Sequence, residues 1–221
     1  MTFKGWPDAA LDFYVGLEAD NSRSYWQAHR STYDECVKAP FAALSELVSR
    51  EFGPLHVFRP NRDTRFSKDK TPYKTAAAAV TESEGGAAYY VQVSAEGLYA
   101  GSGYYHLESD QLQRFRDAVA DERTGPKLAT AVAALRKRRY EVAARESLKR
   151  APRGIDPDHP RAELLRMKGI HVGRSFGAPR WLHTAGASER ILGAWRDAAP
   201  VNRWLDHHVG PSTLAPPEPD L

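Results

Sequence analysis

Residues 62–75, RDTRFSKDKTPYKT, bring together side chains that can bind an anion. The segment has five cations and two acids, and its net charge of +3 equals the formal net charge of the whole chain. Arginine offers a planar fork that matches phosphate or carboxylate, and lysine adds a mobile point charge. We therefore predict that an anionic small molecule binds here. The predicted binding residues are Arg62, Arg65, Lys68, Lys70 and Lys74, with Asp63 and Asp69 orienting the cations.

The same segment also fits an internal ion-pair network with a purely structural or interaction role. Arg62 and Arg65 would then pair with acids of the preceding helices, and the candidates are Asp12, Glu18 and Asp34. Burying charges in this way is costly and adds little stability. This cost is an argument against the structural interpretation, which stays open as an alternative.

If the site also supports a reaction, it needs a proton donor. Candidates are Tyr73 within the segment, and Tyr104 and His106 in the later motif YAGSGYYH. Hydroxyl and imidazole groups can transfer protons, and Tyr104 and His106 would share one face of an extended strand. Gly101 and Gly103 of the same motif indicate a strand that another backbone approaches closely. At this point the sequence leaves open whether the protein is an enzyme.

The most basic stretch of the chain is residues 136–154, with eight cations and two acids. One interpretation is a solvated face. A second is a nucleic-acid-binding surface that combines residues 62–74 with residues 136–153 and contacts phosphates. A third places Arg153 beside the arginines of the first segment, where it completes one anion site.

No metal site is predicted, and the sequence identifies no cofactor. Asp156, Asp158 and His159 are possible ligand types, but DPDHP better fits a turn that caps the following helix. The chain contains no HExxH, Walker or G-x-S-x-G motif. Its single cysteine, Cys36, lies in an amphipathic pattern and is expected in the core.

Length and composition indicate an ordinary globular protein. The 221 residues are 42% hydrophobic and 27% charged, and the formal net charge is +3. One cysteine favours a reducing compartment, and we find neither a secretory leader nor an apolar run of membrane-spanning length. We therefore expect a soluble cytoplasmic protein without a membrane partner.

Hydrophobic periodicity predicts an α+β fold, in which a mainly antiparallel sheet is covered by N-terminal and C-terminal helices. Strands are expected near residues 56–66, 75–80, 88–94, 97–104 and 140–145, with a further candidate at 171–177. Helices are expected near residues 7–20, 22–39, 40–52, 108–122, 126–135 and 161–168, with a helix pair over 188–209 that is divided near Pro200.

Segment 62–75 should lie at the end or edge of this sheet and face a concavity. Phe66 is its single bulky apolar side chain and is expected to be buried as the anchor.

Several motifs together resemble a family of conserved proteins that carry domain of unknown function 2461. The strongest is RDTRFSKDKTPYKT, joined by NSRSYWQAHRSTYDECVKAPF, EGLYAGSGYYHLE and SLKRAPRGIDPDHPRAELLRMKG, in the order of the family. His106 stands where the family pattern usually has proline. The resemblance implies one full-length domain, which we place at residues 1–209, followed by a proline-rich extended tail at 210–221. It implies no activity.

Overall fold

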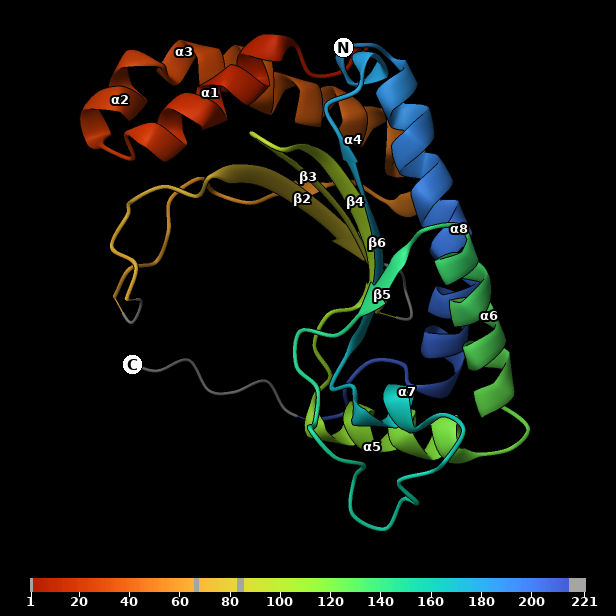
Figure 1. The fold of residues 1–221 in the computed structure, drawn as a ribbon. Coiled ribbons are helices and arrows are strands. Elements are labelled where there is room, and N and C mark those ends of the chain that lie inside the picture. The colour runs from red at the N-terminus through yellow and green to blue at the C-terminus, as the bar shows by residue number, and fades with distance from the viewer. Residues whose placement is uncertain (1, 66–67, 83–85, 215–221) are drawn as a thin grey trace. The chain divides into compact units, whose positions relative to one another are not determined.

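The computed structural model describes residues 2–65, 68–82 and 86–214, and these form an α+β fold (Figure 1). Six strands form one sheet in the order β1-β2-β3-β4-β6-β5, and both outer pairs are antiparallel. The strands are β1 (His56–Val57), β2 (Ala76–Glu82), β3 (Ala88–Ser94), β4 (Gly97–Tyr104), β5 (Glu141–Ala143) and β6 (Ile170–Gly177). The predicted fold class is confirmed.

The predicted strand at residues 56–66 is wrong beyond Val57. Pro60 cannot donate a backbone hydrogen bond, and the chain after Phe58 leaves the sheet. Only an isolated bridge between Asn61 and Tyr73 continues the pairing. Residues 62–65 and 68–75 therefore lie beyond edge strand β1 rather than at the end of a long strand. The expectation that Phe66 is buried lies outside the described residues.

The chain divides into two compact units that interleave in sequence. Unit 1 contains residues 1–82, 89–101 and 174–196, and unit 2 contains residues 83–88, 102–173 and 197–221. The single domain expected from the sequence stays a prediction, as does the tail, whose residues 215–221 lie outside the described part.

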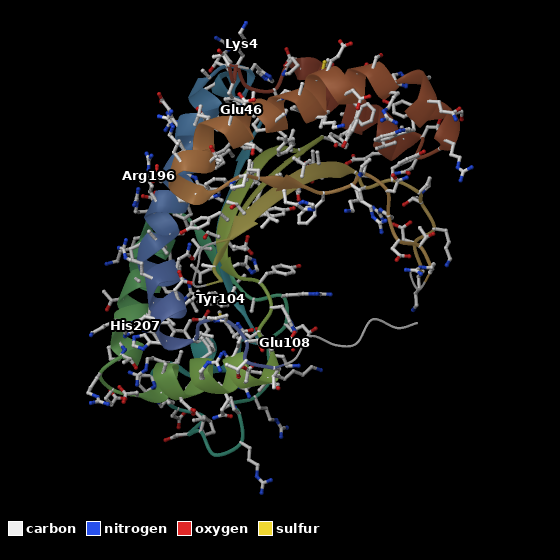
Figure 2. All side chains as sticks on the ribbon, turned by 180° about the vertical axis from the view of Figure 1, so that it is seen from behind. Lys4, Glu46, Tyr104, Glu108, Arg196 and His207 are labelled. Atoms are coloured by element: carbon white, nitrogen blue, oxygen red, sulfur yellow. The ribbon has the colours of Figure 1, made fainter. Side chains whose placement is uncertain are left out.

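Unit 1 begins with helices on one face of its strands (Figure 1). They are α1 (Asp8–Ala19), α2 (Arg23–Ala28), α3 (Arg30–Thr32), the π-helix η1 (Tyr33–Lys38) and α4 (Ala39–Phe52). The 3₁₀-helix η2 (Arg180–His183) and the first half of α8 (Gly186–His208) complete the unit. Trp6, Tyr14, Phe41 and Trp195 are among its largest fully buried side chains. Arg196 of α8, labelled in Figure 2, pairs with Glu51 of α4.

The helix predicted over residues 22–39 is broken in the structure. Ser22 caps α2 by accepting a hydrogen bond from the Tyr25 amide, as its residue type favours. At His29 the backbone leaves the helical region, and a ring nitrogen lies 2.9 Å from the Tyr25 carbonyl oxygen. The helix resumes as α3 and then widens into η1.

Unit 2 packs α5 (Ser109–Ala120), α6 (Gly125–Lys137), α7 (Ala162–Arg166) and the second half of α8 with β5 and the start of β6. Arg161 is buried and stabilises the end of α5, because its Nε donates to the Val119 carbonyl at 2.7 Å and its Nη2 to the Ala120 carbonyl at 3.0 Å.

The expected division near Pro200 is wrong, since α8 continues through this proline. Pro200 is exposed, whereas Trp195, Ala198, Val201 and Leu205 are buried. Burial of an apolar face on both sides of the proline therefore outweighs the loss of one backbone hydrogen bond. Among the described residues, no helix combines the length and apolar character needed to cross a bilayer. The cytoplasmic location stays a prediction.

Candidate functional site

Residues 60–65 and 68–74 lie outside the named strands, and the two ends of this segment are paired with each other. The Arg62 amide donates to the Pro72 carbonyl at 2.9 Å, and the Lys74 amide donates to the Pro60 carbonyl at 2.8 Å. These bonds flank the antiparallel bridge between Asn61 and Tyr73. We call residues 58–62 and 72–74 the loop base, and residues 63–65 and 68–71 the loop tip.

Tyr73 anchors the loop base to the N-terminal helices. Its side chain is 7% exposed and stacks on Trp26 of α2, with ring centroids 4.3 Å apart and planes 10° from parallel. The Asn21 amide group donates to the Tyr73 carbonyl at 3.1 Å and accepts from the Tyr73 amide at 3.0 Å. Tyr73, which the sequence suggested as a proton donor, thus lies in the core. Its packing on Trp26 holds the loop base in place.

The loop tip is held by its own charged groups. Arg65 binds Asp63 through two side-chain bonds, at 3.1 Å from Nε and 2.8 Å from Nη2, and its backbone amide donates to Asp63 as well. These bonds lower the pKa of Asp63 to about 2. Asp69 accepts from the Thr71 amide and hydroxyl and pairs with Arg62.

The remaining tip cations, Lys68 and Lys70, are exposed, and Lys70 donates to the Thr64 carbonyl at 2.8 Å. Arg62 and Arg65 pair with acids inside segment 62–75, whereas the helix acid Asp34 pairs with Arg30. Of the three helix acids that the sequence suggested as partners, Asp12, Glu18 and Asp34, the last is engaged by Arg30 instead.

Three cations gather at the loop base, and we call Arg59, Arg62 and Lys74 the basal cluster. Burial lowers the pKa of the Lys74 ammonium, and the charges of Arg59 and Arg62 lower it further. Lys74 Nζ lies 5.4 Å from the centroid of the Phe58 ring. With the other described residues, Arg59 makes no hydrogen bond or ion pair. Of the three cations only Arg62 forms an ion pair with a described residue, Asp69, and the charge of Arg59 also acts on the exposed carboxylate of Asp63.

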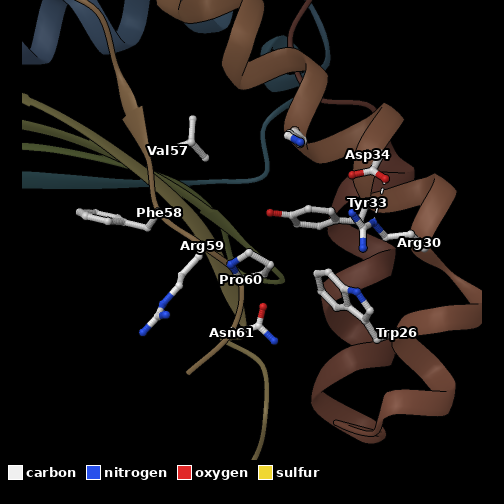
Figure 3. Close-up of a pocket in the computed structure, with 10 residues that line it drawn as sticks. Trp26, Arg30, Tyr33, Asp34, Val57, Phe58, Arg59, Pro60 and Asn61 are labelled. Atoms are coloured by element: carbon white, nitrogen blue, oxygen red, sulfur yellow. Dashed lines mark hydrogen bonds and ion pairs between the residues drawn. The ribbon is translucent and has the colours of Figure 1, made fainter. Parts of the chain in front are cut away.

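A cavity of about 310 Å³ lies between the helices and the loop base (Figure 3). Its walls come from α2, α3, η1 and residues 57–61, and they are Trp26, Arg30, Tyr33, Asp34, Lys38, Val57, Phe58, Arg59, Pro60 and Asn61. Arg59 belongs to both features, because it lines the cavity and its charge acts on Lys74. In Figure 3 its side chain extends away from the wall that Trp26 and Tyr33 form, which places the guanidinium on the rim.

Two oxygen-bearing side chains of η1 face this cavity. The Tyr33 side chain is 5% exposed, and its hydroxyl points from the helix towards residues 57–60 (Figure 3). Asp34 Oδ2 accepts from Arg30 Nε at 2.8 Å, whereas Asp34 Oδ1 is buried and has no hydrogen-bond partner among the described residues. Burial and the neighbouring Asp34 raise the pKa of the Tyr33 hydroxyl, which keeps it protonated.

The other two proton-donor candidates lie in unit 2. Tyr104 is buried, and its hydroxyl donates to Asp206 at 3.1 Å; burial raises its pKa further above the usual range (Figure 2). His106 is exposed, and its Nε2 lies 3.7 Å from the carboxylate of Glu108. The close backbone approach expected in this motif is confirmed at Gly103, where φ is +137° and an added Cβ would lie 2.3 Å from the Ile170 carbonyl oxygen.

The basic stretch of unit 2 is partly neutralised by acids. Arg136 pairs with Glu163, and Arg138 pairs with Asp197. Arg153 lies in an exposed loop before α7 and makes no side-chain hydrogen bond with the other described residues. No group of three His, Cys, Asp or Glu residues within the described ranges could hold a metal ion. In DPDHP, Asp156 accepts from the Asp158 amide at 2.9 Å, in keeping with the predicted turn, but the predicted cap is wrong, because the N-cap of α7 is Arg161 and has no side-chain cap bond.

Sequence reasoning missed Arg59 and the cavity. Arg59 belongs to a run that the sequence indicated as β-strand, and nothing in that pattern marks it as part of a site. A signal did exist on the helix side, because Arg30, Asp34 and Lys38 follow one another at intervals of four residues with alternating charge. That spacing places them along one helical face, next to the aromatic residues Trp26 and Tyr33.

Residues 9–204 match the model of a family described as "Conserved hypothetical protein (DUF2461)", in agreement with the resemblance seen in the sequence. Neither the curated proteins nor the solved structures contain a match to the chain.

Proposed function

Because the chain belongs to the conserved hypothetical protein family DUF2461, whose description assigns no activity, we propose a function from the site itself. The protein binds a small molecule that carries a phosphate or carboxylate group. Arg59, Arg62 and Lys74 hold the anion at the loop base. Arg65, Lys68 and Lys70 at the tip add a positive field that attracts it.

The main support for this proposal is the positive charge of the basal cluster. Lys74 lies partly buried beside Arg59 and Arg62, and this surrounding disfavours its charged form. Neighbouring cations repel one another, and only Arg62 of the three is paired with a described acid, Asp69. A bound anion would relieve that repulsion and would form charge-assisted hydrogen bonds, which are stronger than neutral ones. Arg59 forms no ion pair or hydrogen bond with another described residue, although its charge acts on Asp63, and it is therefore the cation most available to a ligand.

The experiment is calorimetric titration of the protein with inorganic phosphate and with acetate, supported by thermal unfolding. A ligand that binds the folded state raises the melting temperature with concentration. Arg59→Gln and Lys74→Gln should each weaken binding by about tenfold or more, the change expected on losing one hydrogen bond to a charged group.

Two comparison variants sharpen the result. Lys137→Gln removes an exposed cation from unit 2 and should leave the affinity unchanged. Arg65→Gln should lower affinity only slightly, because the Arg65 fork is bound to Asp63 and the side chain is exposed. Equal binding by the wild type, Arg59→Gln and Lys74→Gln would refute the proposed role of the basal cluster. No heat and no thermal shift with either anion at millimolar concentration would refute anion binding itself.

A further inference from the structure

The cavity beside the basal cluster contains an acceptor that the protein leaves unused. Asp34 Oδ1 is buried and lacks a hydrogen-bond partner within the described part of the chain, although Asp34 Oδ2 is bound by Arg30. A buried carboxylate oxygen without a donor loses the hydration that it would have in water, and this loss is costly. Oδ1 is covered in this conformation, but the Asp34 side chain is 41% exposed and lines the cavity, so rotation of the carboxylate turns this oxygen towards a bound molecule.

A second group of the same wall can both donate and accept. The Tyr33 hydroxyl points into the cavity and makes no hydrogen bond with another described residue. The hydroxyl lies within electrostatic range of the charges of both Asp34 and Arg30, so the three groups are close together. All three line the cavity from one side, and residues 57–61 line it from the other.

The backbone of η1 explains why these groups lie together. A π-helix forms its backbone hydrogen bonds between residues i and i+5 instead of i and i+4, and such segments often occur at functional sites. Three of the six residues in η1 line the cavity, namely Tyr33, Asp34 and Lys38. The same segment keeps the Tyr33 ring packed at 4.7 Å from Trp26, which fixes the direction of the hydroxyl.

From these contacts we infer that the ligand is a hydroxylated organic anion, such as a polyol phosphate or a polyhydroxy carboxylate. This inference rests on the proposed function, since the anionic group occupies the basal cluster at the rim. The hydroxyl-bearing part enters the cavity, where one hydroxyl donates to Asp34 Oδ1 and exchanges a hydrogen bond with the Tyr33 hydroxyl. A volume of about 310 Å³ admits a small ligand of this kind and lies at the lower end of ligand pockets, roughly 300–1,000 Å³.

The test compares ligands that differ in their hydroxyl groups and share an anionic group. Glycerol 3-phosphate is paired with inorganic phosphate, and gluconate with acetate, in calorimetric titrations of the full chain. The hydroxylated member of at least one pair should bind about tenfold more tightly, the gain expected from one hydrogen bond to a charged acceptor. Whether the phosphate or the carboxylate pair shows this gain identifies the anionic group.

Variants of the cavity wall then show which side chains cause the tighter binding of the hydroxylated ligand. Tyr33→Phe keeps the buried ring and removes only the hydroxyl, while Asp34→Asn keeps the shape and removes the charge. Both should reduce the advantage of the hydroxylated ligand to less than about threefold and leave the affinity for the bare anion nearly unchanged. Tyr105→Phe and Asp117→Asn remove a hydroxyl and a charge from exposed positions of unit 2 and serve as matched controls.

The outcomes separate this inference from the function on which it rests. If phosphate or acetate binds through Arg59 and Lys74 but the hydroxylated partners bind no better, the hydroxylated ligand class is wrong and anion binding stands. The same holds if the advantage survives in both Tyr33→Phe and Asp34→Asn. If none of the four compounds binds, the proposed function fails and the inference fails with it. The Tyr33→Phe variant keeps the test valid even if Asp34→Asn, which leaves Arg30 without its carboxylate, does not fold.

Discussion

At the scale of single residues, the site depends on how each charge is used. Arg65 and Asp63 satisfy one another over two residues, and their exposure makes the pair a weak contributor to stability. Lys74 differs because it is partly buried, contacts the Phe58 ring and lies in the field of two arginines. The loop tip therefore offers a ligand an arginine that is already paired, whereas the loop base offers Lys74, which has no acid partner among the described residues.

The lowered pKa of Lys74 predicts a pH dependence of anion binding. The folded-state pKa lies below the ordinary 10.5, so Lys74 loses its charge at a lower pH than an exposed lysine. Phosphate affinity should therefore fall as the pH rises through this pKa. Because a bound anion favours the charged form, binding near that pH should take up protons.

Calorimetry in two buffers of different ionisation enthalpy measures this proton uptake. Lys74→Gln should abolish the uptake, and Lys68→Gln, which changes an exposed lysine of the tip, should retain it. An affinity that stays constant up to pH 10.5 in the wild type would show that Lys74 does not hold the anion.

At the scale of elements, the position of the loop base depends on its contacts with α2 and the residue before it. Asn21 stands just before that helix and binds both backbone polar groups of Tyr73, much as a neighbouring strand would. The Trp26 ring then covers the Tyr73 ring. One helix start thus determines where the basal cluster lies relative to the cavity wall within unit 1.

Replacing Asn21 should therefore affect both stability and binding. Asn21→Ala removes two hydrogen bonds to the Tyr73 backbone and should lower the free energy of unfolding by about 1–3 kcal/mol. It should also weaken phosphate binding, although Asn21 is not in the basal cluster. Urea unfolding and calorimetric titration measure the two effects, with Gln27→Ala on the exposed side of α2 as control. Lowered stability with unchanged affinity would mean that the loop base holds its geometry without this link.

At the scale of the whole molecule, the net charge of the protein helps to decide between two kinds of ligand, a small anion and a nucleic acid. The formal net charge is only +3, and two arginines of the most basic stretch are bound to Glu163 and Asp197. Nucleic-acid binding draws on many phosphate contacts and weakens steeply with salt. The other six cations of that stretch form no ion pair with a described residue, so it is the low net charge of the whole chain that favours a ligand with one anionic group.

A mixed-sequence 20-nucleotide DNA should accordingly bind only weakly at 0.15 M salt. Fluorescence anisotropy across a salt series measures the affinity and its salt dependence. Binding that is tight at 0.15 M salt, falls steeply with added salt and is lost when Lys149 and Arg150 are replaced by glutamine would favour the nucleic-acid alternative.

The sequence by itself determined the α+β class, strands β3 and β4, the N-terminal helices and the position of the charged segment. These follow from local properties: hydrophobic periodicity, capping by Ser22, and the concentration of cations in residues 62–75. The long strand at residues 56–66 and the break at Pro200 were wrong, because pairing partners and a buried helix face outweighed local preference.

Only the tertiary structure decided which charges are satisfied. Arg65 forms an ion pair with Asp63, two residues away in sequence. Arg59 and Lys74, in contrast, come close because the two ends of the loop pair with each other. The cavity lies between residues 26–38 and residues 57–61, and Asp34, whose Oδ1 lacks a described partner, is part of its wall. Such contacts join residues distant in sequence, and the order of residue types along a chain does not encode them locally.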